Sequence, residues 1–239
     1  QLGYVVEWKV INAADYGYPQ RRRRTFIVAY ADGTRANKSI MDGNPWSWLR
    51  TEGVLASAFV SSFDELSLPG VPSFSLDLDP VAVTQRFNRG SESKSPFKTS
   101  GIAVDGKVFT LRGRPVYRGR RMKLKHVLQA DDKMSREVRI PKSEVQQWRF
   151  LKGAKSLPRT KRNGVTYTYD EGPIPFPDPI DRPSRTIVTS EGGRSPSRFK
   201  HVVAVGKQSY RRLTPVELER LNGFRANHTK LIGISDARR

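Results

Sequence analysis

Two strand-like runs close together near the beginning of the chain constrain its fold more than any other feature. Residues 4–11 and 24–30 are rich in β-branched and aromatic side chains, which favour β-strands. Residues 12–19 between them contain Gly17 and Pro19, which are typical of turns. Parallel strands need a crossover connection of about a dozen residues or more, so the sequence predicts an antiparallel pair.

The second of these strands follows the basic run Gln20-Arg21-Arg22-Arg23-Arg24. Side chains alternate along an extended chain, so we expect Gln20, Arg22 and Arg24 on one face and Arg21 and Arg23 on the other. Guanidinium groups are permanently charged and bind carbonyl oxygens, carboxylates or phosphates through paired hydrogen bonds. Taken alone, the run fits a solvated basic edge or a localisation signal equally well.

The chain as a whole is strongly basic. It has 43 Lys and Arg against 23 Asp and Glu, a net charge of +20 over 239 residues. Residues 107–162 alone hold 18 basic and 4 acidic residues, which is +14. Such a field attracts polyanions, and this predicts a nucleic acid as the partner. No apolar stretch approaches 18 residues, so the sequence predicts no membrane association.

Cysteine is absent from the chain, and histidine is rare. The absence of cysteine excludes disulfides, thiolate metal sites and a cysteine nucleophile within this chain. The three histidines have no metal-ligand spacing, so we expect no metal site; they are His126, His201 and His228. The sequence begins with Gln1 inside a strand-like pattern and shows no signal peptide, which indicates a piece of a longer protein.

The middle of the chain reads as connectors and short strands. Residues 52–63 are a plausible helix, and residues 69–80, which include three prolines, are typical of a connector. From residue 81 to 178 the pattern predicts a small, irregular, β-rich domain. Its expected strands are residues 107–111, 114–117, 138–140 and 165–169. Five prolines within residues 173–183 then predict a stiff linker.

A short helix is strongly indicated near the end of the chain. Thr214 and Glu217 have the spacing of a capping box, Pro215 stands at the first helical position, and Gly223 stands where the helix would stop. Local physics alone makes this an ordinary capped helix.

Three separated segments gain meaning when they are taken together. They are Asn12-Ala13-Ala14-Asp15-Tyr16-Gly17-Tyr18-Pro19-Gln20-Arg21-Arg22-Arg23-Arg24, Arg182-Pro183-Ser184-Arg185-Thr186-Ile187, and Tyr210-Arg211-Arg212-Leu213-Thr214-Pro215-x-Glu217-x-x-Arg220-Leu221-Asn222-Gly223-Phe224. The first resembles the Gln-x-Arg-x-Arg region of DNA (cytosine-5) methyltransferases. The other two resemble that family's next motif, which braces its target recognition domain. In the family the recognition domain lies between these motifs, where this chain has its basic, irregular segment.

The resemblance implies an α/β fold. We expect the C-terminal part of a Rossmann-like methyltransferase domain, an antiparallel strand pair plus helices, with an inserted small, irregular, β-rich target recognition domain. Residues 1–75 would be strands and helix of the catalytic domain, residues 76–178 the recognition domain, and residues 179–239 the return segment with its bracing helix. The family also implies a bacterial or phage-encoded protein that acts in the cytoplasm at the nucleoid.

The chain also departs from the family pattern. The nucleophilic cysteine, the glycine-bearing S-adenosylmethionine loop and the catalytic Glu-Asn-Val are not found, and the closing Gly-Asn motif would follow Arg239. Asn222 replaces a usual Gln, and Arg225 a usual Pro. The resemblance therefore implies double-stranded DNA as partner and S-adenosyl-L-methionine as cofactor, with the cofactor site mostly outside this chain.

Three interpretations remain open from the sequence. The chain is the C-terminal part of a single-chain cytosine methyltransferase of a restriction-modification system, or the recognition subunit of a two-chain enzyme whose missing N-terminal half is a separate chain. The third interpretation is a non-enzymatic, basic nucleic-acid-binding protein.

The resemblance assigns roles to individual residues. By motif position, Arg24 would contact O2 of a flipped cytosine, Arg22 would orient the nucleophile loop and the catalytic glutamate, and Gln20 would brace that face. Arg21 and Arg23 would be structural or face phosphate.

Candidate DNA-binding residues are basic side chains with interleaved aromatic ones, together with polar residues of the return segment. The set is Lys155, Arg159, Lys161, Arg162, Tyr167, Arg185, Thr186, Ser197 and Arg198, with Ser197 and Arg198 on a loop expected to be flexible. A second basic cluster comprises Arg112, Arg114, Arg118, Arg120 and Arg121.

Overall fold

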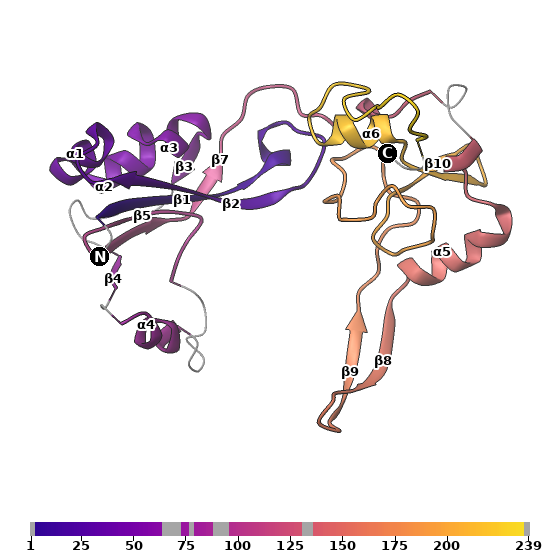
Figure 1. The fold of residues 1–239 in the computed structure, drawn as a ribbon, viewed down its shortest axis with the longest axis horizontal. Helices are drawn as coiled ribbons and strands as arrows, with labels where there is room; N and C mark the ends of the chain where they lie inside the picture. The colour runs from indigo at the N-terminus through magenta and orange to yellow at the C-terminus, as the bar shows by residue number, and fades with distance from the viewer. Residues whose placement is uncertain (1–2, 64–72, 77–78, 88–95, 131–135, 237–239) are drawn as a thin grey trace. The chain divides into compact units, whose positions relative to one another are not determined.

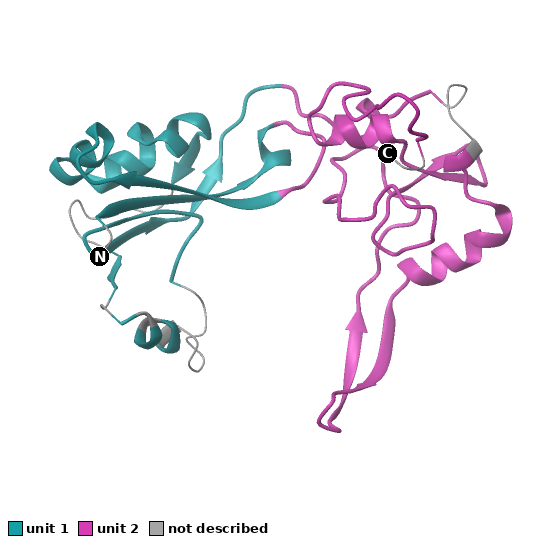
Figure 2. Ribbon diagram, viewed as in Figure 1, with its two compact units in different colours: residues 1–16, 23–119 teal, residues 17–22, 120–239 magenta. Residues whose placement is uncertain are grey.

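The computed structural model of the chain describes residues 3–63, 73–76, 79–87, 96–130 and 136–236 (Figure 1). The backbone forms two compact units (Figure 2). Unit 1 comprises residues 1–16 and 23–119, and unit 2 comprises residues 17–22 and 120–239. The short segment 17–22 thus belongs to unit 2 although unit 1 flanks it on both sides in the sequence.

Unit 1 is built on a five-stranded sheet in the order β2-β1-β5-β6-β4. β1 (Tyr4–Asn12) and β2 (Arg23–Ala31) pair in antiparallel register, which confirms the predicted strand pair. β5 (Ser100–Val104) lies along the other edge of β1, followed by β6 (Lys107–Leu111) and the short β4 (Phe74–Ser75). β6 coincides with the expected strand 107–111.

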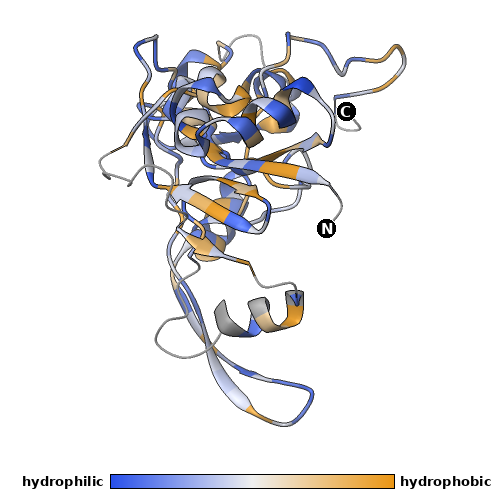
Figure 3. Cartoon of the chain, turned by 90° about the vertical axis from the view of Figure 1, so that its left-hand side faces the viewer, coloured by the Kyte–Doolittle hydropathy of each residue, from blue (hydrophilic) through white to orange (hydrophobic). Residues whose placement is uncertain are grey.

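Short helices follow β2 and lie on one face of this sheet (Figure 1). They are α1 (Arg35–Asp42), α2 (Pro45–Ser47), a π-helical turn (Trp48–Glu52) and α3 (Val54–Ala58). Thr34 begins α1 because its side chain accepts a hydrogen bond from the Asn37 N–H at 3.3 Å. The helices and strands share one apolar core (Figure 3), whose buried residues are Val5, Tyr30, Ile40, Trp46, Leu49, Ile102, Val104, Phe109 and Leu111.

The expected helix over residues 52–63 is wrong in its second half. α3 ends at Ala58, and β3 (Ser61–Phe63) follows and pairs with β7 (Gly113–Pro115). A strand partner about fifty residues further along the chain therefore overrides local helix propensity. β7 is shorter than the expected strand 114–117. A further helix, α4, spans Pro80–Phe87, and most of the expected connector 69–80 lies outside the described residues.

Unit 2 is more irregular and has two separate hairpins. Its 3-10 turns are Leu124–His126, Arg136–Val138 and Lys142–Glu144, and its helices are α5 (Val145–Lys152) and α6 (Pro215–Leu221). One hairpin pairs β8 (Lys155–Thr160) with β9 (Thr166–Glu171), and the other pairs β10 (Val202–Val205) with β11 (Ser209–Arg212). β9 confirms the expected strand near residues 165–169.

The expected strand 138–140 is wrong. Residues Arg136–Val138 form a 3-10 turn, and Arg139 makes only an isolated bridge with Arg211. The Ile140 N–H donates to the Tyr210 carbonyl at 3.0 Å, and Pro141 follows without an N–H of its own, so a ladder cannot continue there. The expected segment has the composition of a strand but not its hydrogen-bonding capacity.

α6 confirms the predicted capped helix. The Glu217 N–H donates to Thr214 Oγ1 at 3.2 Å, and the Thr214 N–H donates to Glu217 Oε2 at 2.9 Å, which completes the capping box. Pro215 is the first helical residue, and Gly223 has a φ of 83°, a left-handed conformation that glycine adopts without strain.

The described chain is thus a mixed α/β protein with antiparallel sheets and few helices. β5 and β6, which fall within the expected recognition segment 76–178, share the sheet of β1 and β2. The Rossmann-like character of the catalytic part and the three functional boundaries stay predictions.

Candidate functional site

Segments that are far apart in the sequence meet at Gln20. Gln20 forms a parallel bridge with Ser184, the Arg21 N–H donates to the Ser184 carbonyl at 2.9 Å, and the Ser184 N–H donates to the Pro19 carbonyl at 2.7 Å. Thr186 adds a hydrogen bond from Oγ1 to the Arg21 carbonyl at 2.5 Å. The arginine-run segment and the Arg182–Ile187 motif therefore lie side by side in unit 2.

The side chain of Gln20 reaches the third motif segment. It is 2% exposed, and its Nε2 donates to the carbonyl of Leu221, the last residue of α6, at 3.4 Å. A buried amide side chain needs such partners, because an unpaired polar group in the interior costs about 1–3 kcal/mol. Gln20 therefore connects the three segments that together resemble one family pattern.

The arginine run does not continue Gln20 as a single strand. The Arg22 N–H donates to the Gln20 carbonyl at 3.1 Å, which turns the chain, and β2 begins only at Arg23. The expected alternation from Gln20 to Arg24 is therefore wrong, because the chain turns between Gln20 and Arg22 and is a continuous strand only from Arg23. Gln20 is buried, whereas the four arginines are exposed, and Arg24 Nη1 donates to the Arg23 carbonyl at 2.7 Å. The catalytic roles expected for Gln20, Arg22 and Arg24 stay predictions.

An ion pair is fully buried beneath α6. Arg211 Nη1 and Nη2 donate to Glu217 Oε2 and Oε1 at 2.8 and 2.9 Å, and neither side chain is more than 2% exposed. Glu217 Oε1 also accepts the Gln129 N–H at 2.7 Å. One carboxylate thus joins β11, the cap of α6 and the segment around Gln129. Paired, bidentate geometry of this kind is what a buried charge requires.

A second buried cluster is centred on Asp178. Its carboxylate accepts hydrogen bonds from Arg185 Nε at 2.7 Å and from the Val202 N–H at 2.9 Å, and Lys152 Nζ lies 3.5 Å away. Burial raises the pKa of Asp178, but the Arg185 hydrogen bond and the Lys152 charge outweigh it and hold that pKa below its usual value. Burial lowers the pKa of Lys152, and Asp178 offsets part of that effect.

Arg185 and Thr186, two expected DNA-binding residues, are engaged inside this part of unit 2. Arg185 binds Asp178 and donates through Nη1 and Nη2 to the carbonyls of Phe199 and Lys200 at 3.1 and 3.3 Å. Thr186 binds the Arg21 carbonyl. The structure thus shows both side chains holding neighbouring segments, and their expected contact with DNA stays a prediction.

The loop of residues 190–200, expected to be flexible, is bound by two cations. Arg212 donates to the carbonyls of Gly192 and Gly193, both at 2.9 Å, and Lys200 Nζ donates to those of Gly193 and Ser195 at 2.8 and 2.6 Å. Burial lowers the pKa of both cations. Ser197 Oγ accepts the Phe199 N–H at 3.4 Å.

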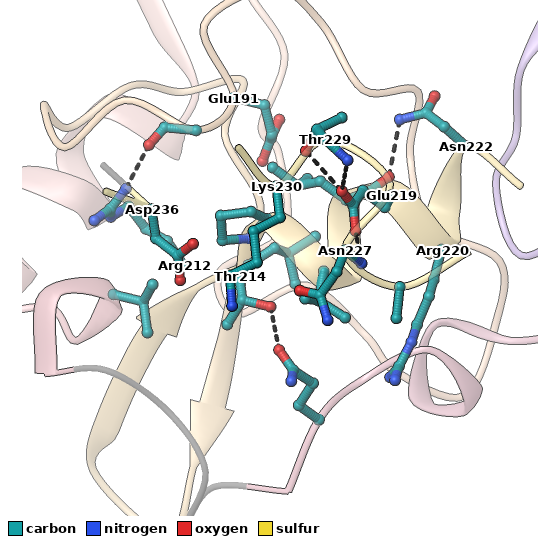
Figure 4. A pocket seen from close by; sticks show the side chains of 18 of the residues that line it. Glu191, Arg212, Thr214, Glu219, Arg220, Asn222, Asn227, Thr229, Lys230 and Asp236 are labelled. Carbon is teal, nitrogen blue, oxygen red and sulfur yellow. Dashed lines mark hydrogen bonds between the residues drawn. The ribbon is translucent and has the colours of Figure 1, made fainter. Parts of the chain in front are cut away.

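A cavity of about 710 Å³ is lined by this loop and by α6 with the residues that follow it (Figure 4). Glu219, on its wall, accepts hydrogen bonds from the Asn227 N–H at 2.7 Å and from the N–H and Oγ1 of Thr229, both at 2.6 Å. Arg212, also on the wall, is occupied by backbone carbonyls. These charged side chains hold the loops around the cavity in place.

The β8–β9 hairpin carries most of the other expected DNA-binding residues. Its register places Leu157 opposite Tyr169 and Arg159 opposite Tyr167. Opposed residues of an antiparallel pair share a face, and alternate residues do so too. One face, the aromatic–basic face, is therefore made of Lys155, Leu157, Arg159, Tyr167, Tyr169 and Glu171.

Two cations of the hairpin are stacked on tyrosines. The Arg159 guanidinium carbon lies 3.7 Å from the centre of the Tyr169 ring, and Lys161 Nζ lies 5.5 Å from that of Tyr167. Such contacts hold the cations in place without neutralising their charge. Arg162 is exposed in the turn, where Gly164 has a φ of 81°. The structure thus gathers Arg159, Lys161, Arg162 and Tyr167 on one hairpin.

Lys155 and Arg198, in contrast, both meet Glu171. Lys155 Nζ lies 3.5 Å from Glu171 Oε2, and Arg198 Nη1 binds the same oxygen. Arg198 Nη2 also donates to the Gly172 carbonyl at 2.7 Å. These two expected DNA-binding side chains are therefore paired with an acid in the structure.

Comparison with known proteins decides the family. A sequence model described as C-5 cytosine-specific DNA methylase matches residues 1–232. The chain belongs to this family. It is 34% identical over 232 residues to the type II methyltransferase M.Sau3AI of Staphylococcus aureus, covering 96% of this chain and 53% of that protein. A shorter match is M.MthTI of Methanothermobacter thermautotrophicus, 61% identical over 31 residues, which are 13% of this chain and 9% of that protein. Another is M.DsaV of Dactylococcopsis salina, 49% identical over 37 residues, 16% of this chain and 10% of that protein.

The match confirms the family resemblance read from the three motif segments. The chain spans about half the length of M.Sau3AI, the relative that it matches along most of its own length. No solved structure gives a significant match. Among the described residues, no helix is long and apolar enough to cross a membrane.

Sequence reasoning assigned no individual role to several buried charged residues that bind neighbouring segments of unit 2. They are Lys152, Asp178, Lys200, Arg211 and Arg212. Arg211 carried one usable signal, because it lies six residues before the capping glutamate and on the same motif. Asp178 has no such signal, because nothing in the sequence pattern indicates that Lys152 and Arg185 are its partners.

Proposed function

We propose that this chain is the part of a DNA (cytosine-5) methyltransferase that recognises the target sequence and carries the Gln-x-Arg-x-Arg segment. The substrate is a cytosine within a specific duplex sequence, flipped out of the base stack. The observation that supports this most strongly is the meeting of the three family-like segments at Gln20, 201 residues from Leu221 in the sequence. Within unit 2, the segments between them then extend from one common base, as expected of an inserted recognition domain.

The chemistry assigns limited roles to the residues of this chain. A thiolate must add to C6 of the cytosine to make C5 nucleophilic, and this chain has no cysteine, so another part of the enzyme supplies it. A fixed cation near O2 of the base stabilises the charge that develops on the ring. Arg24 takes this role in our proposal, Arg22 orients the groups that attack, and Gln20 holds the segment to α6.

S-adenosyl-L-methionine supplies the methyl group in this family's reaction. Within the described residues we identify no set of side chains that fits it. The carboxylate of Glu219 in the cavity of Figure 4, for example, is already occupied by Asn227 and Thr229. We therefore place the cofactor site mostly outside this chain and derive no step through it.

The partner in this proposal is double-stranded DNA, and the β8–β9 hairpin is the element of unit 2 best suited to meet it. A two-stranded ribbon fits the major groove, where each base pair has a distinct pattern of donors and acceptors. Arg159, Lys161 and Arg162 give the far end of the hairpin three positive charges with no acid between them. Exposed basic residues elsewhere in unit 2 then add contacts to phosphate.

Selection of duplexes from a random-sequence pool tests this function directly with the chain as it exists. We expect enrichment of one short sequence that contains a cytosine, because base-edge contacts specify and phosphate contacts do not. Replacing the partner of that cytosine by a mismatched base should tighten binding, since an unpaired base costs less to flip. A pool that shows no enrichment, or an enriched site without C·G pairs, would contradict the proposal.

A further inference from the structure

Glu171 joins the hairpin to a distant segment of unit 2. Its Oε2 lies 3.5 Å from Lys155 Nζ, across the hairpin, and the same oxygen binds Arg198 Nη1, 27 residues further along the chain. Its Oε1 accepts the Tyr169 hydroxyl at 3.1 Å. One carboxylate thus receives two cations and a hydroxyl. Because Lys155, the first residue of β8, pairs with Glu171, the last residue of β9, this cluster lies at the base of the hairpin.

The cluster is shielded from water far more than the rest of the hairpin. The side chains of Lys155, Arg198 and Glu171 are 11%, 13% and 17% exposed. Lys155 also donates to the Leu151 carbonyl at 2.8 Å and lies 5.1 Å from the centre of the Phe150 ring, both in α5. Ion pairs in such surroundings are screened less than pairs on an open surface.

A hairpin of this kind needs an anchor. Two isolated strands are marginally stable in water, and most residues of β8 and β9 are exposed on both faces. Arg198, by contrast, belongs to a loop whose carbonyls are bound by Arg212 and Lys200. Glu171 therefore ties an exposed ribbon to a segment that is itself held at several points.

We propose that Glu171 is a positioning residue for DNA recognition, a proposal that rests on the proposed role of the hairpin. It sets the direction in which the hairpin leaves the rest of unit 2. It also keeps Lys155 and Arg198 away from phosphate, so that the cations at the far end of the hairpin meet the DNA first. Cations paired with an acid add little to non-specific binding of phosphate. The contacts made by the far end of the hairpin then decide where on the duplex the protein binds.

The first test measures the direction of the hairpin without DNA. The chain has no cysteine, so Asn163→Cys in the turn and Gln147→Cys in α5 can be spin-labelled without background. We expect a narrow distance distribution in the parent and in the control Asp170→Asn. Asp170 is the exposed neighbour on the other face of β9, and its substitution changes the net charge equally. Glu171→Gln should broaden or shift the distribution.

A charge swap separates positioning from general destabilisation. In the triple variant Glu171→Arg with Arg198→Glu and Lys155→Glu, both ion pairs are rebuilt in reverse, and we expect the narrow distribution to return. The swap also provides a readout if Glu171→Gln alone fails to fold. An unchanged distribution in Glu171→Gln, or a swap that folds without restoring the narrow one, would overturn the proposal.

The second test uses duplex DNA at several salt concentrations. Glu171→Gln should release both cations and steepen the log-log salt slope by up to about 1.8, at roughly 0.9 for each additional phosphate neutralised. Asp170→Asn should leave the slope as it is. Equal slopes in both variants would contradict the withholding of cations. Failure of every form to bind DNA would instead contradict the proposed function, while the distance measurement still decides whether Glu171 positions the hairpin.

Discussion

Several charged side chains buried in unit 2 are bound by an opposite charge or by several carbonyl oxygens. The carboxylate of Asp178 accepts hydrogen bonds from Arg185, Lys152 and a backbone N–H. Arg212 donates hydrogen bonds to three backbone carbonyls. Removing one partner from such a group leaves an uncompensated charge in the interior, which is costly. Single residues of this kind therefore hold the irregular loops of unit 2, where regular secondary structure is scarce.

The depressed pKa of Asp178 predicts a loss of stability in acid. Its ionised form is favoured by folding, so this stability is fully present above its unfolded pKa of about 3.9 and is lost as pH falls through the lower folded value. Urea unfolding followed from pH 7 to pH 3 should show this decline. Asp178→Asn should be less stable at pH 7 and should decline less over the same range. A parallel decline in both proteins would contradict the assignment.

Arg24 and Arg23 make a matched pair for testing catalysis, because neighbouring residues of β2 point to opposite faces. In an enzyme assembled from this chain and the missing catalytic part, Arg24→Ala should slow single-turnover methyl transfer about a hundredfold, the loss of about 3 kcal/mol. Arg23→Ala should cost much less in rate. DNA affinity measured in parallel shows whether Arg23 holds a phosphate. Equal small losses in rate would mean that the run is a generic basic edge.

At the scale of elements, α6 shows how far local sequence can predict structure. Thr214, Pro215 and Gly223 predicted its ends because each acts through its own backbone neighbourhood. The hydrogen bond that Glu217 accepts from the Gln129 N–H was not predictable in this way, since Gln129 lies 88 residues away in the sequence. Local rules likewise failed for residues 61–63 and 138–140, where partners elsewhere in the chain, or their absence beside a proline, decided the outcome.

Glu217 should therefore contribute more to the free energy of unfolding than a helix cap alone does. Glu217→Gln leaves Arg211 buried without a counter-charge, and breaking a buried pair costs about 3–5 kcal/mol. A capping contact alone is worth about 1 kcal/mol. Urea denaturation of the variant and of Asp170→Asn, an exposed acid of the same unit, measures the difference. A loss near 1 kcal/mol would show that the ion pair adds little.

The hairpin should dominate the salt dependence of DNA binding. Removing the three cations at its far end, in the triple variant Arg159→Ala, Lys161→Ala and Arg162→Ala, should flatten the log-log slope by up to about 2.7, at roughly 0.9 for each phosphate no longer neutralised. The control removes three exposed basic residues of unit 1, with Arg35→Ala, Lys38→Ala and Lys107→Ala. Equal changes in slope would mean that DNA responds only to net charge.

At the scale of the whole molecule, the sequence predicted the family and the antiparallel pair of β1 and β2, because motif order and strand composition are both readable in one dimension. It did not predict that β5 and β6 extend the same sheet, since strand pairing between distant segments leaves no local signal. Nor did it predict that Gln20 is buried while its arginine neighbours are exposed. The bonds to Ser184 and Leu221 that produce this difference come from the other end of the chain.

This chain alone should not transfer methyl groups. It has no thiol to attack C6 of cytosine, and it spans 53% of the length of M.Sau3AI. Incubation with duplex DNA and S-adenosylmethionine carrying a labelled methyl group should give no incorporation above background. Turnover by the purified chain would contradict the proposal that another part of the enzyme supplies the nucleophile.

The make-up of unit 2 also has a consequence for how the protein folds during synthesis. The hydrogen-bond partner of Arg21, Thr186, is synthesised 165 residues later, and that of Gln20, Leu221, is synthesised 201 residues later. At about 5–20 residues per second, translation separates these partners by roughly ten to forty seconds. The β1–β2 pair has partners close in sequence, and we expect it to form early, with the segment between its strands still unbound. Closing unit 2 is then the last and slowest event, and a nascent chain that stalls before α6 would leave this segment open to chaperones and proteases.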